Sequence, residues 1–304
     1  MNKPRKQEEK LKIQIPKNAS KEEIEEFIRE LQNAKTQAPI VGKTKEIIIT
    51  AEHQDKMRAA CAFNADLMDY VRLMMNPGMV LEEIDSRIDY FTREHGHIPA
   101  CKGYLGYPKS SCISVNNVIC HGIPDSYVLK EGDIANVDLT TIVDGWHGDQ
   151  SETFIIGEVP DYVTKLVQCA FDSMHNAIDS LYPKCKVKRI GAAIEKRTKK
   201  DGFSVVKHFQ GHGIGQKFHQ EPNIPHFVHP HFGDFKLKPG MCFTIEPMIN
   251  AGKWEAVIDK KDKWTARTLD GSLSAQFEHT ILMTKSGPEI LTITKHGPQK
   301  GHKF

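Results

Sequence analysis

The sequence predicts an α+β protein made of two similar halves that share one antiparallel sheet. The 304 residues twice show the same order of predicted elements, in which two helices are followed by several strands. Matching residues also recur at a constant offset, since Gly96 and Gly202 lie 106 positions apart. Further pairs at this offset are Pro77 and Pro183, Ile84 and Ile190, and Ile88 and Ile194. We therefore expect halves at about 47–158 and 159–295, with a cleft that favours a binding site.

Composition narrows the class of protein. Hydrophobic residues make up 39% and charged residues 26%, which is typical of a globular protein. A net charge of +2 argues against general nucleic-acid affinity, and no apolar segment approaches the roughly 20 residues of a membrane span. The charged N-terminus does not resemble a signal peptide. Seven cysteines without a CxxC pair indicate free thiols, so we expect a cytoplasmic protein without membrane or specific nucleic-acid partners.

Apolar spacing predicts two helices and four strands in the first half. Thr50 is a potential N-cap of the first helix, and Asn76, Pro77 and Gly78 end it. The expected helices cover about 51–75 and 80–95, and the expected strands cover about 113–115, 118–120 and the two arms of a hairpin at 133–156.

The second half repeats this order. Pro183 ends its first helix, and its second helix ends before Gly202. The expected helices cover about 161–182 and 187–201, and the expected strands cover about 203–206, 241–249, 255–258, 264–268, 275–284 and 289–294.

Residues 1–45 differ in composition from the rest of the chain. They contain eleven Lys or Arg and seven Glu, but no Cys, Trp, Tyr or His. Ser20 and Glu23 form a potential capping box, and the apolar residues that follow predict one short amphipathic helix. We expect a basic N-terminal extension at 1–45, either a solvated tail or an arm that contacts RNA or the ribosome, and a main domain at 46–304.

Two aspartates of the predicted hairpin are candidate metal ligands. A turn centred between Val143 and Asp144 places Asp138 directly opposite Asp149. Side chains so placed have Cβ atoms about 4.5–5.5 Å apart. A turn shifted by one whole residue makes the pair diagonal but leaves both on one face. Carboxylates this close repel unless one is protonated or a cation lies between them, so the pair indicates a metal site; two solvent-facing aspartates are the alternative.

The second half supplies three further candidates. Later in the repeat the offset becomes 108, as between Gly132 and Gly240. Glu246 likewise lies 108 positions after Asp138, so the repeat places it at the equivalent strand position. Glu278 lies in an apolar, strand-like segment, where a buried acid needs a partner or a metal. His212 adds an imidazole from the glycine-rich segment 211–215, whose glycines allow close approach of the backbone. Oxygen-rich ligation with one imidazole suits Mn²⁺, Fe²⁺ or Co²⁺, and also Zn²⁺.

Two other histidines are candidate substrate contacts. His121 precedes a Gly-Ile-Pro segment, and His219 lies seven residues after His212. Each alone is more often structural, but beside a metal centre each can donate to a carbonyl or a tetrahedral oxyanion. His226, His229 and His231 lie among Pro and Phe and are expected in a loop; no carboxylate accompanies them, which argues against a second metal site. Walker A, GxSxG and HExxH patterns do not occur, so the chemistries that need them lose support.

These residues resemble a known family. Asp138, Asp149, His212, Glu246 and Glu278, in this order, resemble the five ligands of the dimetal methionine aminopeptidases of the pita-bread fold, peptidase family M24. Segments similar to that family lie at 106–110, 121–124, 211–215, 243–248 and 272–280, and the similarity covers about 50–295. Only 32 positions separate Glu246 from Glu278, which leaves no room for the helical insertion of type 2 enzymes. Because no cysteine precedes Cys61, the zinc fingers of eukaryotic type 1 enzymes are also absent, and the chain resembles a simpler type 1 enzyme.

The resemblance implies a role for each ligand. Asp138 chelates one of two divalent ions, and Asp149 and Glu278 bridge both. His212 and Glu246 complete the shell of the second ion. Glu246 also serves as general base for a metal-bridging hydroxide that attacks the first peptide bond.

The resemblance further implies a methionine pocket. His121 and His219 contact the substrate and stabilise the tetrahedral intermediate. The pocket residues implied are Cys101, Tyr104, Tyr107, Cys112, Phe218 and Trp264. Rings and thiols suit a thioether. The implied activity is removal of the initiator methionine from nascent polypeptides whose second residue is small, by a protein expected to be monomeric.

Two alternatives stay open at this point. A proline-directed peptidase of the same fold is one, although such enzymes usually carry a large folded N-terminal domain, and here only about 45 residues precede the first repeat. The other is a metal-free homologue that acts as a binding protein, which predicts lost ligands, whereas all five are present.

Overall fold

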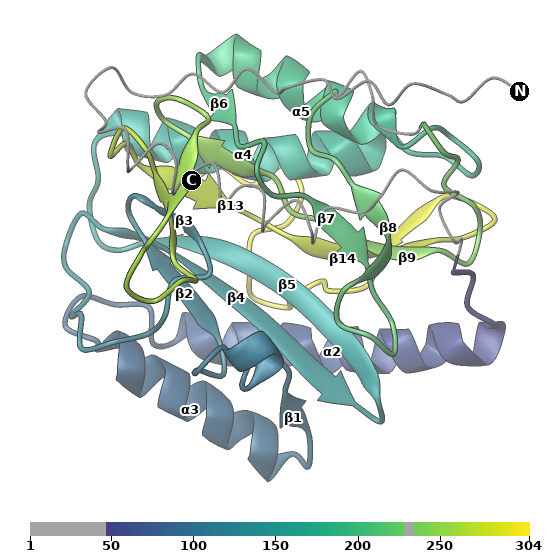
Figure 1. The fold of residues 1–304 in the computed structure, drawn as a ribbon, viewed down its shortest axis with the longest axis horizontal. Coiled ribbons are helices and arrows are strands. Elements are labelled where there is room, and N and C mark those ends of the chain that lie inside the picture. Colours follow the sequence, from purple (N-terminus) through teal and green to yellow (C-terminus); the bar gives the residue numbers. More distant parts are fainter. Residues whose placement is uncertain (1–46, 229–233) are drawn as a thin grey trace, which may run out of the picture. The chain divides into compact units, whose positions relative to one another are not determined.

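The computed structural model describes residues 47–228 and 234–304 (Figure 1). Contacts divide the chain into one unit at Met1–Lys43 and another at Thr44–Phe304, and all that follows concerns the second unit. The amphipathic helix expected after Ser20, like the rest of the expected extension, lies outside the described residues.

The four helices predicted from apolar spacing are confirmed, with some ends a few residues sooner than expected. They are α2 (Ala51–Arg72), α3 (Leu81–Glu94), α4 (Asp161–Asp179) and α5 (Lys188–Asp201). Thr50 caps α2 as predicted, because its Oγ1 accepts a hydrogen bond from the His53 backbone N–H at 3.3 Å. Figure 1 shows α4 and α5 on one side of the strands and α2 and α3 on the other.

The first half contains one long hairpin flanked by shorter strands. Its strands are β1 (Ile98–Pro99), β2 (Cys112–Val115), β3 (Val118–Cys120), β4 (Ile134–Val143) and β5 (Trp146–Ile155), with a 3₁₀ turn at Tyr104–Gly106. β4 lies between β1 and β2 and also pairs with β5. Val137 and Leu139 of β4 pack with Leu67 of α2 and Ile84 of α3 in one buried apolar cluster.

The predicted hairpin is confirmed, but its turn is centred one residue later than expected, which shifts the strand pairing by two residues. Asp149 lies opposite Thr140, and Asp138 lies opposite Ser151. The reason is a two-residue turn at Asp144 and Gly145, whose φ angles of 49° and 80° are both positive, as the favoured hairpin turns require. Asp138 and Asp149 are therefore a diagonal pair on one face of the hairpin.

The second half has shorter strands. They are β6 (Ser204–Val205), β7 (Gly211–Gly213), β8 (Gln220–Ile224), β9 (Cys242–Ile245), β10 (Met248–Asn250), β11 (Ala256–Ile258), β12 (Ala266–Thr268), β13 (Ser274–Gln276), β14 (His279–Met283) and β15 (Pro288–Ile290). Each of the expected strands 241–249 and 275–284 is interrupted in its middle, and the strand order is β15-β14-β9-β7-β8 in one sheet and β13-β10-β6 in another. Backbone pairing thus divides the expected single sheet into four pieces.

Hydrogen bonds between the halves hold these pieces together. The Gln276 carbonyl in β13 accepts from Asn136 Nδ2 of β4 at 2.9 Å and from Thr153 Oγ1 of β5 at 2.7 Å. The Glu278 backbone N–H donates to the Ser151 carbonyl at 2.9 Å. The interrupted strands of the second half therefore lie directly against the continuous hairpin of the first.

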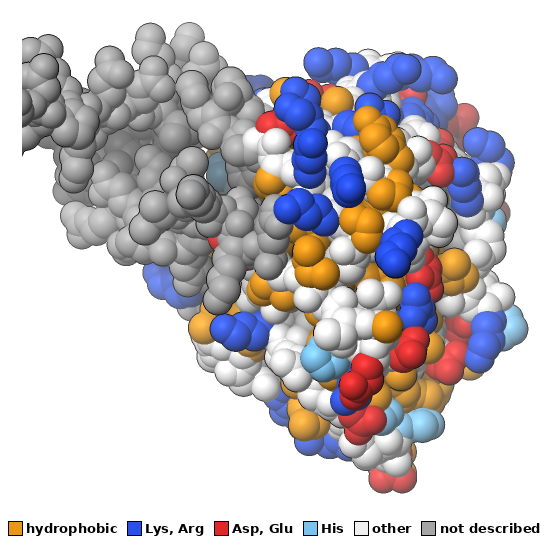
Figure 2. Space-filling view, turned by 90° about the vertical axis from the view of Figure 1, so that its right-hand side faces the viewer, with side chains coloured by type: hydrophobic (Ala, Val, Ile, Leu, Met, Phe, Trp, Pro, Cys, Tyr) orange, Lys and Arg blue, Asp and Glu red, His pale blue; other side chains and the backbone are white. Residues whose placement is uncertain are grey.

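The surface is charged unevenly. Figure 2 shows Lys and Arg side chains gathered on the upper part of one face, with more Asp and Glu lower down. In the described part of the chain, no helix has the length and apolar character needed to cross a membrane.

Candidate active site

The five ligand candidates come from five segments that meet at the junction of the two halves. Asp149, His212 and Glu278 are buried, and each brings one ligand atom to within 4.8 Å of the other two. His212 Nε2 lies 3.6 Å from Asp149 Oδ2 and 3.7 Å from Glu246 Oε1. Asp138 is partly exposed and lies two residues before Thr140, the residue opposite Asp149, on the same face of the hairpin.

Strand register explains why Glu246 and Glu278 meet. β9 pairs with β14 so that Ile245 lies opposite His279, and β10 pairs with β13 so that Met248 lies opposite Gln276. Both ladders, extended into the gap between them, place Glu246 opposite Glu278. At this gap the Glu246 backbone N–H donates to His226 Nε2 at 3.2 Å instead of to a neighbouring strand.

Two threonines orient the carboxylates. Thr140 Oγ1 donates to Asp149 Oδ1, and Thr244 Oγ1 donates to Glu246 Oε1, both at 2.7 Å. Thr244 Oγ1 also accepts from the His212 backbone N–H at 3.0 Å. His212 Nδ1 lies 3.0 Å from the Gly213 carbonyl, which leaves Nε2 directed at the acids. Contacts of this kind, outside the ligands themselves, fix ligand orientation in metal sites.

Burial and mutual repulsion dominate the electrostatics. Burial raises the pKa of Asp138 from 3.8 to about 7. Burial raises the pKa of Glu278 well above its usual range, and the charges of Asp149, Glu246 and Asp138 raise it further. Burial lowers the pKa of His212 to about 4, so its imidazole is neutral at neutral pH. A bound cation would relieve the repulsion among these acids.

The donor set fits divalent metal ions. It consists of four carboxylates and one neutral imidazole whose free nitrogen faces them, which is the ligand chemistry of Mn²⁺, Fe²⁺, Co²⁺ and Zn²⁺. The candidate ligand atoms of Asp149, His212 and Glu278 are crowded and buried, and hydrogen bonds from threonines orient Asp149 and Glu246. The residues present can therefore hold a metal centre.

The residues of the expected methionine pocket lie together beside this cluster. Cys101, Tyr107 and Cys112 form a small buried apolar group, against which Phe218 and Trp264 pack. The Tyr107 and Trp264 rings meet edge to face at 5.2 Å. Cys112 lies opposite Asp138 on neighbouring strands, so the apolar group directly adjoins the acids.

The two expected substrate histidines lie on either side of the pocket. The His219 ring lies 4.2 Å from the His212 ring, and its Nδ1 lies 2.9 Å from the Tyr104 hydroxyl. His121 has a left-handed backbone with a φ of 57°, and its ring lies edge-on to Trp264 at 6.1 Å. Burial lowers the pKa of His121 to about 4, so this ring is neutral at neutral pH.

Sequence reasoning missed His226, Thr140 and Thr244. His226 was expected in a loop without a role, but it is buried and accepts the Glu246 backbone N–H. No local pattern marks it, because the contact forms only when the halves fold together. Thr140 and Thr244 carried a usable signal, since each lies two residues from a candidate ligand and therefore on the same strand face.

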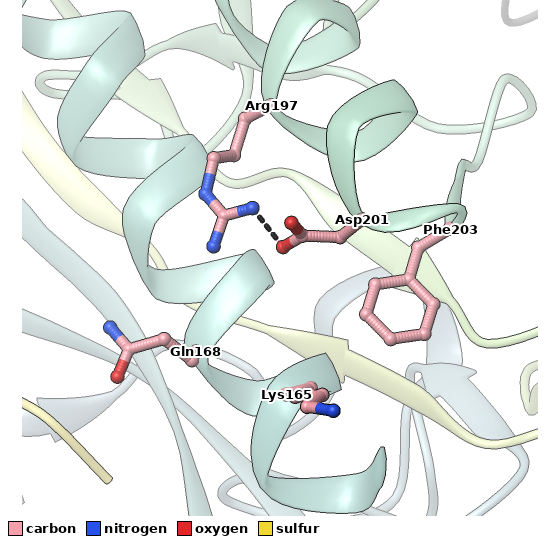
Figure 3. A pocket seen from close by; sticks show the side chains of 5 residues that line it. All are labelled: Lys165, Gln168, Arg197, Asp201 and Phe203. Atoms are coloured by element: carbon pink, nitrogen blue, oxygen red, sulfur yellow. Dashed lines mark hydrogen bonds and ion pairs between the residues drawn. The ribbon is translucent and has the colours of Figure 1, made fainter.

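Another hollow lies away from this cluster, between α4 and α5 (Figure 3). It has a volume of about 360 Å³ and is lined by Lys165, Gln168, Arg197, Asp201 and Phe203. Arg197 pairs with Asp201 and, at 3.1 Å, with Asp172. With Arg197 already paired and only one acid in its lining, this pocket lacks the ligand set of the carboxylate cluster.

Comparisons with known proteins agree with this geometry. The model of metallopeptidase family M24 matches residues 55–285. Methionine aminopeptidase A of Synechocystis sp. is 48% identical over 247 residues, covering 81% of this chain and 97% of the relative. Methionine aminopeptidase of Escherichia coli K12 is 47% identical over 251 residues, covering 82% and 94%.

Solved structures give the same answer. A crystal structure of methionine aminopeptidase from Rickettsia prowazekii matches with a TM-score of 0.79 and 43% identity, covering 81% of this chain and 99% of that chain. An X-Pro aminopeptidase from Thermotoga maritima matches with a TM-score of 0.64 but only 18% identity, and this chain covers 63% of it, so that likeness concerns the fold alone.

Proposed function

The chain belongs to metallopeptidase family M24, with the pita-bread fold, and is a metal-dependent aminopeptidase that removes N-terminal methionine; we propose that its substrates are nascent polypeptides with a small second residue. The observation that carries this proposal is the contact between two kinds of site. Asp138 lies opposite Cys112, so the acid cluster directly adjoins the apolar group that we assign as the methionine pocket. A methionine side chain in the pocket would place its own peptide bond at the acids.

We assign the metal ligands residue by residue. Asp138, Asp149 and Glu278 would hold two divalent ions together with His212 and Glu246. When bound, such ions lower the pKa of water and polarise the carbonyl of the peptide bond. The donor set suits Co²⁺, Mn²⁺, Fe²⁺ or Zn²⁺ alike, so the identity of the ions is a matter for metal analysis.

Glu246 is the proposed general base. Its Oε1 is held by Thr244 and faces His212, whereas the contact of its Oε2 with Gln276 Nε2, within the described part of the chain, is long at 3.5 Å. Oε2 is therefore the atom best placed to take a proton from water and return it to the departing amine.

His121 and His219 are the proposed substrate contacts. Both are neutral at neutral pH, so each keeps one ring nitrogen for an N–H donor and one for an acceptor. Because His219 Nδ1 is occupied by the Tyr104 hydroxyl, its Nε2 is left for the substrate. N–H donors directed at the carbonyl oxygen stabilise the charge that develops there.

The pocket predicts selectivity for the first residue. Cys101, Tyr104, Phe218 and Trp264 offer an apolar slot that suits unbranched methionine and norleucine. Lysine is rejected because an unpaired buried ammonium is costly. Leucine branches one carbon nearer the backbone, and misfits of this kind cost about 1–3 kcal/mol, or 10- to 200-fold in kcat/KM.

A peptide series tests the proposed function. We expect Met-Ala-Ser to be cleaved fastest, Leu-Ala-Ser and Met-Leu-Ser to be poor substrates, and a chelator to abolish all cleavage until a divalent ion is restored. Equal rates on Leu-Ala-Ser or Met-Leu-Ser would rule out the pocket assignment. Cleavage of an Ala-Pro peptide in preference to Met-Ala-Ser would favour the proline-directed alternative.

The partner of the basic extension is a separate proposal. We propose that residues 1–45 contact the ribosome, because their eleven Lys or Arg against seven Glu favour binding to the phosphate backbone of RNA. We also propose that the protein is a cytoplasmic monomer. Cosedimentation with ribosomes at low salt, with full-length protein and a variant lacking residues 1–45, tests this contact. Equal sedimentation of the two proteins would contradict it.

A further inference from the structure

Asp85 on α3 is a buried acid outside the metal cluster. It is 5% exposed, and one of its oxygens, Oδ1, accepts three hydrogen bonds. The donors are the Ser110 backbone N–H at 3.0 Å, the Ser111 backbone N–H at 2.9 Å and Ser111 Oγ at 2.8 Å. One helix side chain therefore fixes the backbone of a whole turn, and a carboxylate accepts such bonds more strongly than a neutral group does.

The Ser110–Ser111 turn lies between two residues of the proposed methionine pocket. Tyr107 precedes it and Cys112 follows it, and both belong to the buried apolar group beside the acids. The Tyr107 hydroxyl donates to the Gly122 carbonyl at 2.8 Å and to the Ser111 carbonyl at 3.1 Å. The position of Ser111 thus sets where the Tyr107 phenol and the Cys112 thiol lie.

The same network reaches His121. The Gly122 carbonyl also accepts from the Ile113 backbone N–H at 2.9 Å. A Cβ at Gly122 would meet the Ile113 carbonyl oxygen at 2.3 Å, so this close approach admits only glycine. His121, which adopts a left-handed conformation, is held on the N-terminal side of this fixed point.

We propose that Asp85 is a positioning residue for the peptidase reaction: through the Ser110–Ser111 turn it holds the wall of the methionine pocket and, through Tyr107 and Gly122, the backbone of His121. This inference rests on the proposed function for its kinetic consequences. Its structural consequence, a fixed Cys112, does not depend on activity.

The test replaces Asp85 and measures selectivity together with thiol protection. In metal-loaded Asp85→Ala we expect the ratio of kcat/KM for Met-Ala-Ser over Leu-Ala-Ser to fall about tenfold, chiefly through a higher KM for Met-Ala-Ser. Modification of Cys112 by N-ethylmaleimide, followed by peptide mass spectrometry, should become at least tenfold faster. Cys169, buried in α4 far along the chain, is the internal reference and should keep its rate.

Three matched variants make the result specific. Asp85→Asn keeps an oxygen acceptor and should restore most of the selectivity. Ser111→Ala removes one of the three bonds and should have an intermediate effect. Glu82→Gln alters an exposed contact of the same helix with the same turn, Lys109 Nζ to Glu82 Oε1 at 2.5 Å, and should change neither readout by more than twofold.

The outcomes separate the two proposals. Unchanged selectivity and unchanged Cys112 labelling in folded Asp85→Ala would overturn the positioning role, as would a lower melting temperature with both readouts intact. If Asp85→Ala does not fold, Asp85→Asn and Ser111→Ala decide: wild-type labelling and selectivity in both would overturn it. If the wild type fails to cleave Met-Ala-Ser, the proposed function fails, whereas the labelling still tests the network.

Discussion

The two halves present their acids in different ways. In the first half, Asp138 and Asp149 come from one uninterrupted hairpin of ten residues per strand. In the second half the equivalent ladder is broken, and Glu246 and Glu278 lie in the gap between β9 with β14 and β10 with β13.

The break is what allows the halves to join. The Glu278 backbone N–H donates to Ser151 of the first half, and the Glu246 N–H donates to His226, because neither bonds across its own ladder. A continuous strand needs no outside partner for its backbone, whereas an interrupted one must find one. The first half thus provides an uninterrupted hairpin, and the second half completes the site against it.

The largest expected effect on turnover comes from replacing a proposed metal ligand in the uninterrupted hairpin of the first half. Asp149→Asn should lower turnover of Met-Ala-Ser by more than about a hundredfold, because a neutral amide is a poor metal ligand and changes outside the ligands already cost about 10–100-fold. The near-isosteric change should leave the fold intact, as circular dichroism can check. Asp144→Asn, in the exposed turn of the same hairpin, is the control and should keep wild-type activity. Turnover of Asp149→Asn within tenfold of wild type would remove Asp149 from the ligand set.

The next effect compares the two orienting threonines. Thr140 donates to one acid, whereas Thr244 donates to Glu246 and also accepts from the His212 backbone. Loss of these contacts should weaken metal binding about tenfold in Thr140→Val and closer to a hundredfold in Thr244→Val. Metal titration of the two variants measures this difference, and the serine variants should retain wild-type affinity. Equal losses of metal affinity in the two valine variants would show that Thr244 orients the ligands of the second half no more strongly than Thr140 orients Asp149.

How much of this arrangement the sequence predicts depends on the range of the contacts. Apolar spacing and Gly or Pro stops predict the four helices of residues 47–228 and 234–304, because those signals are local. The 108-residue offset predicts that Glu246 matches Asp138 in position, and the structure places Glu246 directly after β9, which pairs with β14. The expected turn centre is wrong by one residue and the pairing by two, because a Val-Asp-Gly turn allows two centres and only the positive φ of Asp144 and Gly145 selects one.

Other features are invisible along the chain. β7 and β8 were not predicted, since short glycine-rich strands show no alternation and are stabilised by their neighbours in the sheet. His226 likewise gains its role only from the break in the second half. The metal ligands, pocket residues and substrate histidines stay predictions, supported by their proximity in the fold.

A smaller effect concerns pH in chelator-treated protein. Because burial raises the pKa of Asp138 from 3.8 to about 7, the folded state holds this proton more tightly than the unfolded state does. The contribution of Asp138 to stability is therefore complete below the unfolded pKa and is lost as pH rises through about 7. Between about pH 6.5 and 8.5 this loss amounts to about 1 kcal/mol.

Histidines of lowered pKa, such as His212 and His121, act in the opposite sense, since they lose stability as pH falls. Comparison with Asp138→Asn cancels this shared background. Urea unfolding at both pH values should show wild type losing more stability than Asp138→Asn over this interval. A larger loss in the variant would contradict the raised pKa.

The smallest expected effect tests whether the two halves alone supply every residue of the active site. Deletion of residues 1–45 should change kcat/KM for Met-Ala-Ser by no more than about twofold, as is typical of changes away from a site. The physical reason is that every proposed ligand and pocket residue lies at or beyond Cys101, and α2 of the first half begins at Ala51. Full-length and shortened proteins should be compared at matched metal content and after a melting curve for each. A folded, metal-loaded but inactive shortened protein would mean that the extension supplies part of the site, and that two halves alone do not make the enzyme.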